Sequence, residues 1–253
     1  MKIVTQKNQE SQSQPVLVNG LSNEFSHCES GGLERVYLTG ESAFKAWCQL
    51  QRPRPDRPTI WFKFGHDNFY RSEFDTSGGF GITRNCGSNA EGRKDKARYP
   101  DAFRHLRSRS EREDGGVFYL PDLPEKSPAK ESVPSSNSVR VEFDEGTRDE
   151  QWAKLEAIAT IGGLPPTWIC TSGNVSLHPH WQLDDFYPIA TTTYLNRVLA
   201  VLLISDPAVI NIPQPMRVPG FFRKEKGGEQ ELVSVSGRRY SPDELTDGLR
   251  KYA

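Results

Sequence analysis

Residues 139–145 read Val-Arg-Val-Glu-Phe-Asp-Glu, and this alternation of apolar and polar residues constrains the fold more than any other stretch of the chain. Successive side chains of a strand point to opposite faces. The three apolar residues can therefore be buried on one face while Glu142 and Asp144 project together from the other, separated by about 6.6 Å of strand rise. The pattern predicts a half-buried strand at residues 139–145 with two carboxylates at its end.

Two carboxylates held this close repel each other unless a cation lies between them. Hard divalent cations take oxygen ligands, and pairs of magnesium ions about 3.5 to 4 Å apart are common in phosphoryl and nucleotidyl transfer. Taken alone, however, an E-x-D pair is more often a solvated strand end. The motifs elsewhere in the chain are needed to distinguish a metal site from a solvated strand end.

Residues 165–183 predict a hairpin, because apolar and polar positions alternate on both sides of the turn at Gly173. Ser176 and His178 would share one face of the second strand, and His180 would join them if Pro179 does not distort it. A hydroxyl beside an imidazole suits phosphate oxygens. The alternative, favoured for this motif by itself, is a structural histidine in a hairpin.

An apolar helix is predicted at residues 193–204, and Asp206 follows it. By itself, Asp206 would be a helix-ending or turn residue before a proline. The segment 211–224, rich in proline and containing a glycine, then presents three cations. Cations on a shaped loop are what a triphosphate requires, and they are Arg217, Arg223 and Lys224.

The ordered set E-x-D, S-x-H, D and R-V-P-G-F resembles the archaeo-eukaryotic primase superfamily, in particular the primase-polymerase domains of plasmid, phage and mobile-element replication proteins. The likeness runs from residue 139 to about residue 226, and residues 115–119 resemble the strand that precedes the catalytic half in this family. Alternating strands and helices with hairpins independently indicate an α+β fold. The resemblance implies an RRM-like catalytic sheet packed with an N-terminal α/β module.

The resemblance also implies an activity, namely metal-dependent, template-directed nucleotidyl transfer from NTPs or dNTPs on a single-stranded DNA template, in primer synthesis, primer extension or both. By resemblance, Glu142, Asp144 and Asp206 bind two Mg²⁺ or Mn²⁺ ions and form the catalytic set with His178. Ser176 and His178 would contact the incoming nucleotide, and its triphosphate would be held by Arg217, Arg223 and Lys224.

Two other functions fit parts of the pattern. The first is a catalytically weak replication-initiation or single-stranded DNA-binding module, against which the three intact acids count. The second is a metal-dependent phosphodiesterase, which has less need for S-x-H and the Arg217 segment. The sequence has no helicase phosphate loop, so a replicative helicase would be a partner protein or a further domain.

The formal net charge of −1 gives no global attraction to nucleic acid, so a template must be held by a local cluster. The best candidate is residues 93–112, in which the expected phosphate contacts are Arg98, Arg104, Arg107 and Arg109. Acidic residues are interleaved with them. An ordinary solvated helix with salt bridges therefore fits the same residues.

The four cysteines are scattered without C-x-x-C spacing, which indicates reduced thiols rather than a zinc site or disulfides. No apolar run reaches the roughly 18 residues that span a bilayer, and the polar start lacks a signal-peptide core. We therefore expect a cytoplasmic protein with no membrane partner.

Three segments are expected: a flexible one at 1–32, an N-terminal module at 33–137, and the catalytic module at 138–253, whose C-terminal helix begins at Ser241 and Pro242.

Overall fold

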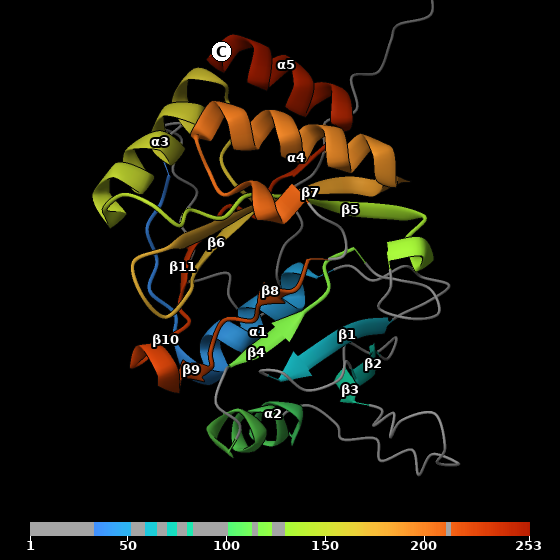
Figure 1. Ribbon diagram of the computed structural model, residues 1–253, viewed down its shortest axis with the longest axis vertical. Coiled ribbons are helices and arrows are strands. Elements are labelled where there is room, and N and C mark those ends of the chain that lie inside the picture. Colours follow the sequence, from blue (N-terminus) through green and yellow to red (C-terminus); the bar gives the residue numbers. More distant parts are fainter. Residues whose placement is uncertain are drawn as a thin grey trace, which may run out of the picture.

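Two sheets form the framework of the structure, a computed structural model that describes residues 33–51, 59–64, 70–74, 80–82, 101–112, 116–122, 130–210 and 214–253 (Figure 1). The segment 1–32, expected to be flexible, lies outside these ranges. The mixture of helices with largely antiparallel sheets confirms the α+β fold expected from the sequence. No helix in the described ranges combines the length and apolar character that crossing a membrane requires.

The first sheet has the strand order β3-β2-β1-β4-β8, with every neighbouring pair antiparallel. It contains two successive antiparallel pairs, β1 with β2 and β2 with β3. Its last strand comes from far along the chain, so the segment that carries Arg217 forms one edge of this sheet. The strands are β1 (Thr59–Phe64), β2 (Tyr70–Phe74), β3 (Phe80–Ile82), β4 (Val117–Tyr119) and β8 (Met216–Arg217).

The second sheet is built around the long strand β7, with β5 paired to one of its edges and β6 and β12 paired to the other. The hairpin expected at residues 165–183 is its β6–β7 pair. The strands are β5 (Ser135–Arg140), β6 (Trp168–Thr171), β7 (Leu177–Pro188), β11 (Leu232–Val235) and β12 (Arg239–Tyr240). A separate two-stranded ribbon is formed by β9 (Phe222–Arg223) and β10 (Gly228–Glu229).

The strand expected at residues 139–145 was wrong in its bounds, because β5 ends at Arg140 and the carboxylates follow it. The chain nevertheless stays extended beside β7: the Val141 N–H donates to the Pro179 carbonyl at 3.3 Å and the Phe143 N–H to the Leu177 carbonyl at 3.2 Å. Since β7 begins at Leu177, it does not extend far enough to pair with the residues that follow Phe143. The predicted alternation survives, with Val141 and Phe143 fully buried.

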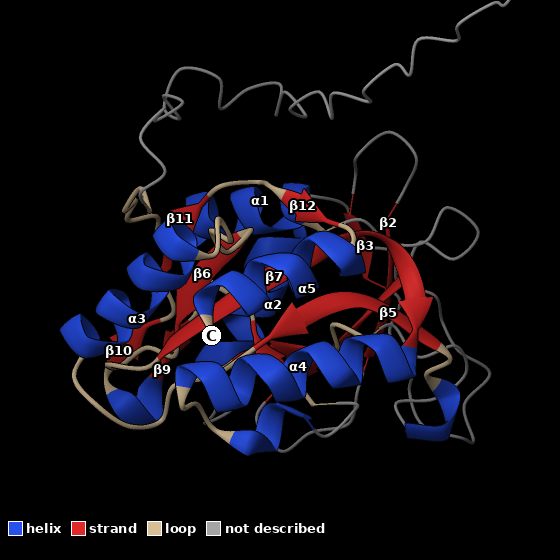
Figure 2. Cartoon of the chain, turned by 90° about the horizontal axis from the view of Figure 1, so that it is seen from above, coloured by secondary structure: helices blue, strands red, loops and turns tan. Residues whose placement is uncertain are grey.

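Three helices cover one face of the second sheet (Figures 1 and 2). They are α3 (Arg148–Ile161), α4 (Ile189–Leu203) and α5 (Pro242–Tyr252). The helix start expected at Ser241 is confirmed, because its hydroxyl accepts from the Glu244 N–H in a capping box with Pro242 at the first helical position. Thr147 and Glu150 form the same box at the start of α3. The apolar sides of these helices and of the sheet form one continuous core.

The opposite face of the second sheet packs against a second core, formed with the first sheet, α1 (Gly40–Leu50) and α2 (Asp101–Arg112). Trp168 and Cys170 of β6 point into this core, whereas Ile169 points toward the helices. Both faces of β6 are therefore buried. Aromatic side chains dominate the second core, with ring centroids 4.8 to 6.0 Å apart among Phe44, Trp47, Phe103, Tyr119 and Phe221.

The two halves of the chain are interleaved rather than stacked end to end. The expected boundary at residues 137 and 138 falls within β5, and β8 returns to the first sheet. Leu38 forms an isolated bridge to Leu232 of the second sheet. Short 3₁₀ turns complete the described chain at η1 (Lys130–Ser132), η2 (Pro207–Ile210) and η3 (Lys224–Lys226).

Candidate active site

Three carboxylates converge beyond the ends of β5 and α4. Glu142 and Asp144 follow β5, and the backbone N–H of Asp206 donates to the Glu142 carbonyl at 2.9 Å. The pKa of Asp144 is raised by partial burial, then by the negative charges of Glu142 and Asp206. The structure therefore brings together the three acids that the sequence singled out, although they come from segments about sixty residues apart.

The turn that delivers Asp206 is strained. Ile204, the C-cap of α4, has φ of 51° and adopts the left-handed conformation, which is unfavourable for a β-branched residue. The chain then reverses direction, and the Asp206 Oδ1 accepts from the Ala208 N–H at 2.9 Å. This hydrogen bond and the one to Glu142 fix the position of Asp206 in the short connection between α4 and η2.

Glu142 contacts His178 directly, with Oε1 3.0 Å from Nε2, an ion pair when the imidazole is protonated. His178 is buried and lies on β7 opposite Cys170 of β6, so its ring points into the space between the two layers. Burial alone would raise the pKa of Glu142, but His178 and, after it, Arg217 and Arg223 lower that pKa to about 2. Glu142 is therefore ionised throughout the physiological pH range.

A buried glutamine that the sequence did not single out holds the carboxylate segment against β7. The Gln151 side chain on α3 donates from Nε2 to the Glu145 carbonyl at 3.2 Å, while its Oε1 accepts from the Leu177 N–H at 2.8 Å. Gln151 thus fixes the loop after Asp144 to the strand that carries His178. A polar residue on the otherwise apolar inner side of α3 was the signal available in the sequence.

A cationic loop, defined here as residues 217–226, forms one side of the site. The Arg217 guanidinium lies 4.5 Å over the Phe118 ring. Burial, and then the neighbouring charge of Arg223, lowers its pKa to about 10. Arg223 forms an ion pair with Glu225, which also lies 3.9 Å from Arg217. The remaining expected triphosphate contact, Lys224, is exposed at the start of η3.

The β9–β10 ribbon, which includes Arg223 of the cationic loop, approaches the β6–β7 turn closely because Gly228 faces Gly173. A Cβ on Gly228 would lie 2.1 Å from the Gly173 carbonyl oxygen, and Gly173 itself has φ of +80°. Side chains at these positions would push the two turns apart. The contact lets Arg223 donate from Nη1 to the Ser172 carbonyl at 3.4 Å, above the hairpin that carries His178.

The two remaining polar positions of this hairpin differ in environment. Ser176 is half-buried immediately before β7, two residues from His178. His180 stacks on Trp168 with ring centroids 3.7 Å apart. Burial, and then the charges of Arg140 and His178, lowers its pKa well below the ordinary value, so that its imidazole is neutral. His180 is therefore a neutral part of the core between the layers.

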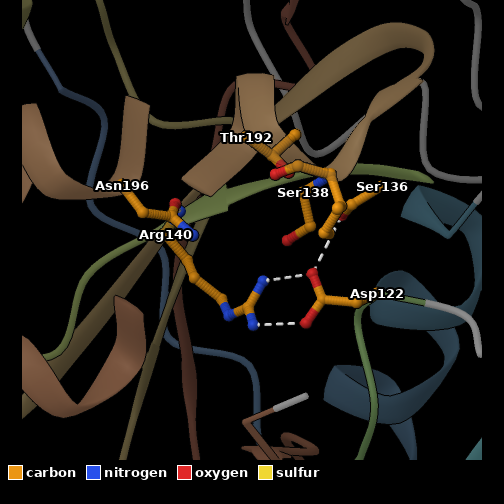
Figure 3. A network of polar contacts seen from close by, with 7 residues as sticks. Asp122, Ser136, Ser138, Arg140, Thr192 and Asn196 are labelled. Atoms are coloured by element: carbon orange, nitrogen blue, oxygen red, sulfur yellow. Dashed lines mark hydrogen bonds and ion pairs between the residues drawn. The ribbon is translucent and has the colours of Figure 1, made fainter. Parts of the chain in front are cut away.

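A fully buried ion pair links the two sheets behind the site (Figure 3). Asp122, just after β4, accepts two hydrogen bonds from Arg140 of β5, at 2.9 and 2.6 Å, and a third from the Ser136 hydroxyl at 2.9 Å. Neither charged side chain is exposed. The Arg140 backbone N–H donates to Asn196 of α4 at 2.8 Å. Sequence reasoning missed this pair, although Arg140 stands within an otherwise buried strand.

The arginines expected to contact a template are only partly described. Arg104 and Arg107 are exposed on α2, and Arg107 pairs with Glu111 at 2.8 Å, as the salt-bridged alternative anticipates. Arg109 lies within α2, but its side chain and the whole of Arg98 are outside the described residues. The helix adjoins the cationic loop, since the Ser110 hydroxyl donates to the Phe222 carbonyl at 3.3 Å.

The carboxylates have the chemistry of a divalent-cation site, but they are not assembled as one. Within the described ranges, no three His, Cys, Asp or Glu side chains are grouped closely enough to hold a metal ion. Asp144 and Asp206 offer hard oxygen donors, and a cation would relieve the repulsion that raises the pKa of Asp144. Glu142 is engaged by His178, so its carboxylate would have to turn away from the imidazole to join them.

No protein-family description and no curated protein sequence matches this chain. Among solved structures, the chain is similar to the AEP domain of the cyanophage S-2L primase-polymerase, with a TM-score of 0.57 and 14% identity over 82% of this chain and 96% of that one. The fold is archaeo-eukaryotic primase-like. The catalytic domain of the primase RepB′, solved in complex with initiator DNA, matches with a TM-score of 0.48 and 12% identity over 82% of this chain and 94% of that one.

Proposed function

We propose that this chain is a DNA primase-polymerase, which transfers nucleotides from NTPs or dNTPs onto a primer or an initiating nucleotide along a single-stranded DNA template. The observation that carries the proposal is the meeting of crowded carboxylates, a buried histidine and a cationic loop on one face of an archaeo-eukaryotic primase-like fold. Replication of a plasmid, phage or mobile element would supply the template. A replicative helicase as partner and a cytoplasmic location remain predictions.

Asp144 and Asp206, joined by Glu142, are the residues that would hold Mg²⁺ or Mn²⁺, in the two-metal arrangement that the sequence resemblance implies. Bound there, the cations would neutralise the charge that develops on phosphate oxygens and lower the pKa of a 3′-hydroxyl. Glu142 carries its negative charge even before a metal binds, because its low pKa keeps it ionised at any pH at which a polymerase works. His178, released from Glu142, would then be free to donate to a nucleotide phosphate.

The cationic loop would receive the triphosphate. Arg217 and Arg223 both face Glu225, an exposed carboxylate that balances part of their charge. A triphosphate carries more charge than one carboxylate and would replace Glu225 in these contacts. Ser176, at the start of β7, would supply a hydroxyl beside His178, and Lys224 would add a further cation at the rim of the site.

A template strand would leave the site over α2. The hydrogen bond from Ser110 to Phe222 places this helix against the cationic loop, and Arg104 and Arg107 lie on its exposed side. Their contacts to phosphates would position a strand without reading its bases. This arrangement fits an enzyme that must accept any template sequence.

Incorporation of labelled dNTPs on a single-stranded template, with and without a primer and with Mg²⁺, Mn²⁺ or EDTA, tests the proposal. We expect incorporation that requires metal and template. DNA binding with no incorporation under any condition would favour the weak initiation module, and metal-dependent cleavage of the template would favour the phosphodiesterase. His178→Ala and Arg217→Ala should weaken nucleotide binding about tenfold to a hundredfold, the loss expected for a charge-assisted contact, with template binding unchanged.

A further inference from the structure

Gln230 is buried without any exposed surface, between the cationic loop and β11. Its backbone holds the loop in place: its N–H donates to the Phe221 carbonyl at 3.0 Å, and its carbonyl accepts from the Gly220 N–H at 2.6 Å. The side chain of Gln230, unlike its backbone, makes no hydrogen bond: neither amide atom has a partner among the described residues. Burying an amide in this way is unfavourable unless a partner is reached.

The guanidinium of Arg217 also lacks a hydrogen-bond partner for one of its nitrogens: Nη1 is buried and has no such partner in the described part of the chain. Both side chains meet at Gly116: a Cβ there would lie 3.4 Å from Arg217 Nη1, 3.5 Å from Gln230 Oε1 and 3.6 Å from Gln230 Nε2. Gly116 leaves this space open, so an unsatisfied donor and an unsatisfied acceptor face the same small volume.

We propose that Gln230 is a positioning residue for Arg217, whose guanidinium it holds from behind for the triphosphate of the incoming nucleotide. The proposal rests on the proposed function. A small rotation of either side chain would let the amide oxygen of Gln230 accept from Arg217 Nη1 across the space beside Gly116, and Nη2, the nitrogen that faces Glu225, would stay directed toward the site. An arginine fixed on its Phe118 face and at Nη1 loses less rotational freedom when a ligand binds.

Gln230 has no exposed surface, so it does not contact the nucleotide itself, and all of its effect must pass through Arg217. A double-mutant cycle measures this dependence directly. Equilibrium binding of a fluorescent dATP analogue in the presence of Mg²⁺ would be compared for the wild type, Gln230→Leu, Arg217→Ala and the double variant. Gln182→Leu is the matched control, because Gln182 is a buried glutamine on β7 that also has an unpartnered amide oxygen.

We expect Gln230→Leu to weaken nucleotide binding about fivefold, the net effect of one typical intramolecular hydrogen bond, with kcat at saturating nucleotide changed less than about twofold. The double variant should bind no more weakly than Arg217→Ala, and Gln182→Leu should bind like the wild type. Unchanged binding by Gln230→Leu, or losses that multiply in the double variant, would overturn the proposal.

If Gln230→Leu does not melt cooperatively, Gln230→Glu takes its place in the same cycle, since a carboxylate there still accepts from Arg217. It should bind the analogue within about twofold of the wild type, whereas a fivefold loss that persists in the Arg217→Ala background would overturn the inference. Failure of the proposed function is distinguishable, because the wild type itself would then bind no nucleotide.

Discussion

Asp122→Ala should destabilise the fold strongly, because it leaves the Arg140 guanidinium buried without its counter-ion. Both side chains have no exposed surface, and the carboxylate accepts three hydrogen bonds, two from Arg140 and one from Ser136 (Figure 3). Removing one member of a buried pair costs about 3 to 5 kcal/mol. For a chain of this length that corresponds to a fall in Tm of about 6 to 20 °C.

Thermal melting followed by circular dichroism measures this effect, and an ion pair of similar length supplies the control. Arg107 and Glu111 are 2.8 Å apart, but both are more than half exposed. Arg107→Ala should therefore change the free energy of unfolding by no more than about 0.5 kcal/mol. Equal Tm changes for the two variants would refute the argument that burial decides the value of each pair.

A double replacement separates the cost of a stranded charge from the value of the pair. Asp122→Leu combined with Arg140→Met removes both charges and fills the space with apolar groups, which is often neutral or stabilising. We expect the double variant to melt well above Asp122→Ala. A double variant as unstable as Asp122→Ala would instead show that the hydrogen bonds between the sheets, rather than the charges, hold the two layers together.

Three further outcomes follow from the geometry of the site. The pKa of Glu142 is lower in the folded chain than in the unfolded one, so its charge stabilises the fold at neutral pH. A shift of this size corresponds to about 3 kcal/mol. This stabilisation is lost as the pH falls from about 5 to about 2. The stability difference between wild type and Glu142→Gln, measured by urea unfolding, should therefore shrink in acid; a constant difference would contradict the assignment. Glu225→Gln should tighten nucleotide binding up to about fivefold by releasing both arginines of the cationic loop, and weaker binding would show that Glu225 orients them instead. Charge reversal at Arg104 and Arg107 should reduce the salt slope of single-stranded DNA binding by about 0.7 per lost contact, and an unchanged slope would place the template elsewhere.

The sequence predicted best the features that depend on local chemistry. Alternation around Glu142 and Asp144 identified the buried and exposed faces, and the Ser241 cap with its proline identified the start of α5. These features depend on residues within a few positions of one another. The fold followed from the order of motifs along the chain.

The features that the sequence did not predict depend on distant partners. The end of β5 is set by the residue at which β7 begins, and the bond between Gln151 and Leu177 joins a helix to a strand 26 residues away. The Arg140–Asp122 pair needs two sheets to be in place before either charge can be buried. The sequence can mark Gln151 and Arg140 as polar residues among apolar ones, but no local pattern identifies the distant groups that they bind.

Single-nucleotide incorporation by Asp144→Asn, compared with Glu145→Gln, tests the central claim most directly. Both changes remove one negative charge from neighbouring exposed carboxylates, but only Asp144 is crowded by Glu142 and Asp206. We predict that Asp144→Asn abolishes metal-dependent incorporation without lowering Tm, since losing a repelled charge relieves the folded state, and that Glu145→Gln retains activity within about twofold of the wild type. Full incorporation by Asp144→Asn, or equal loss in both variants, would contradict a catalytic site built on these carboxylates.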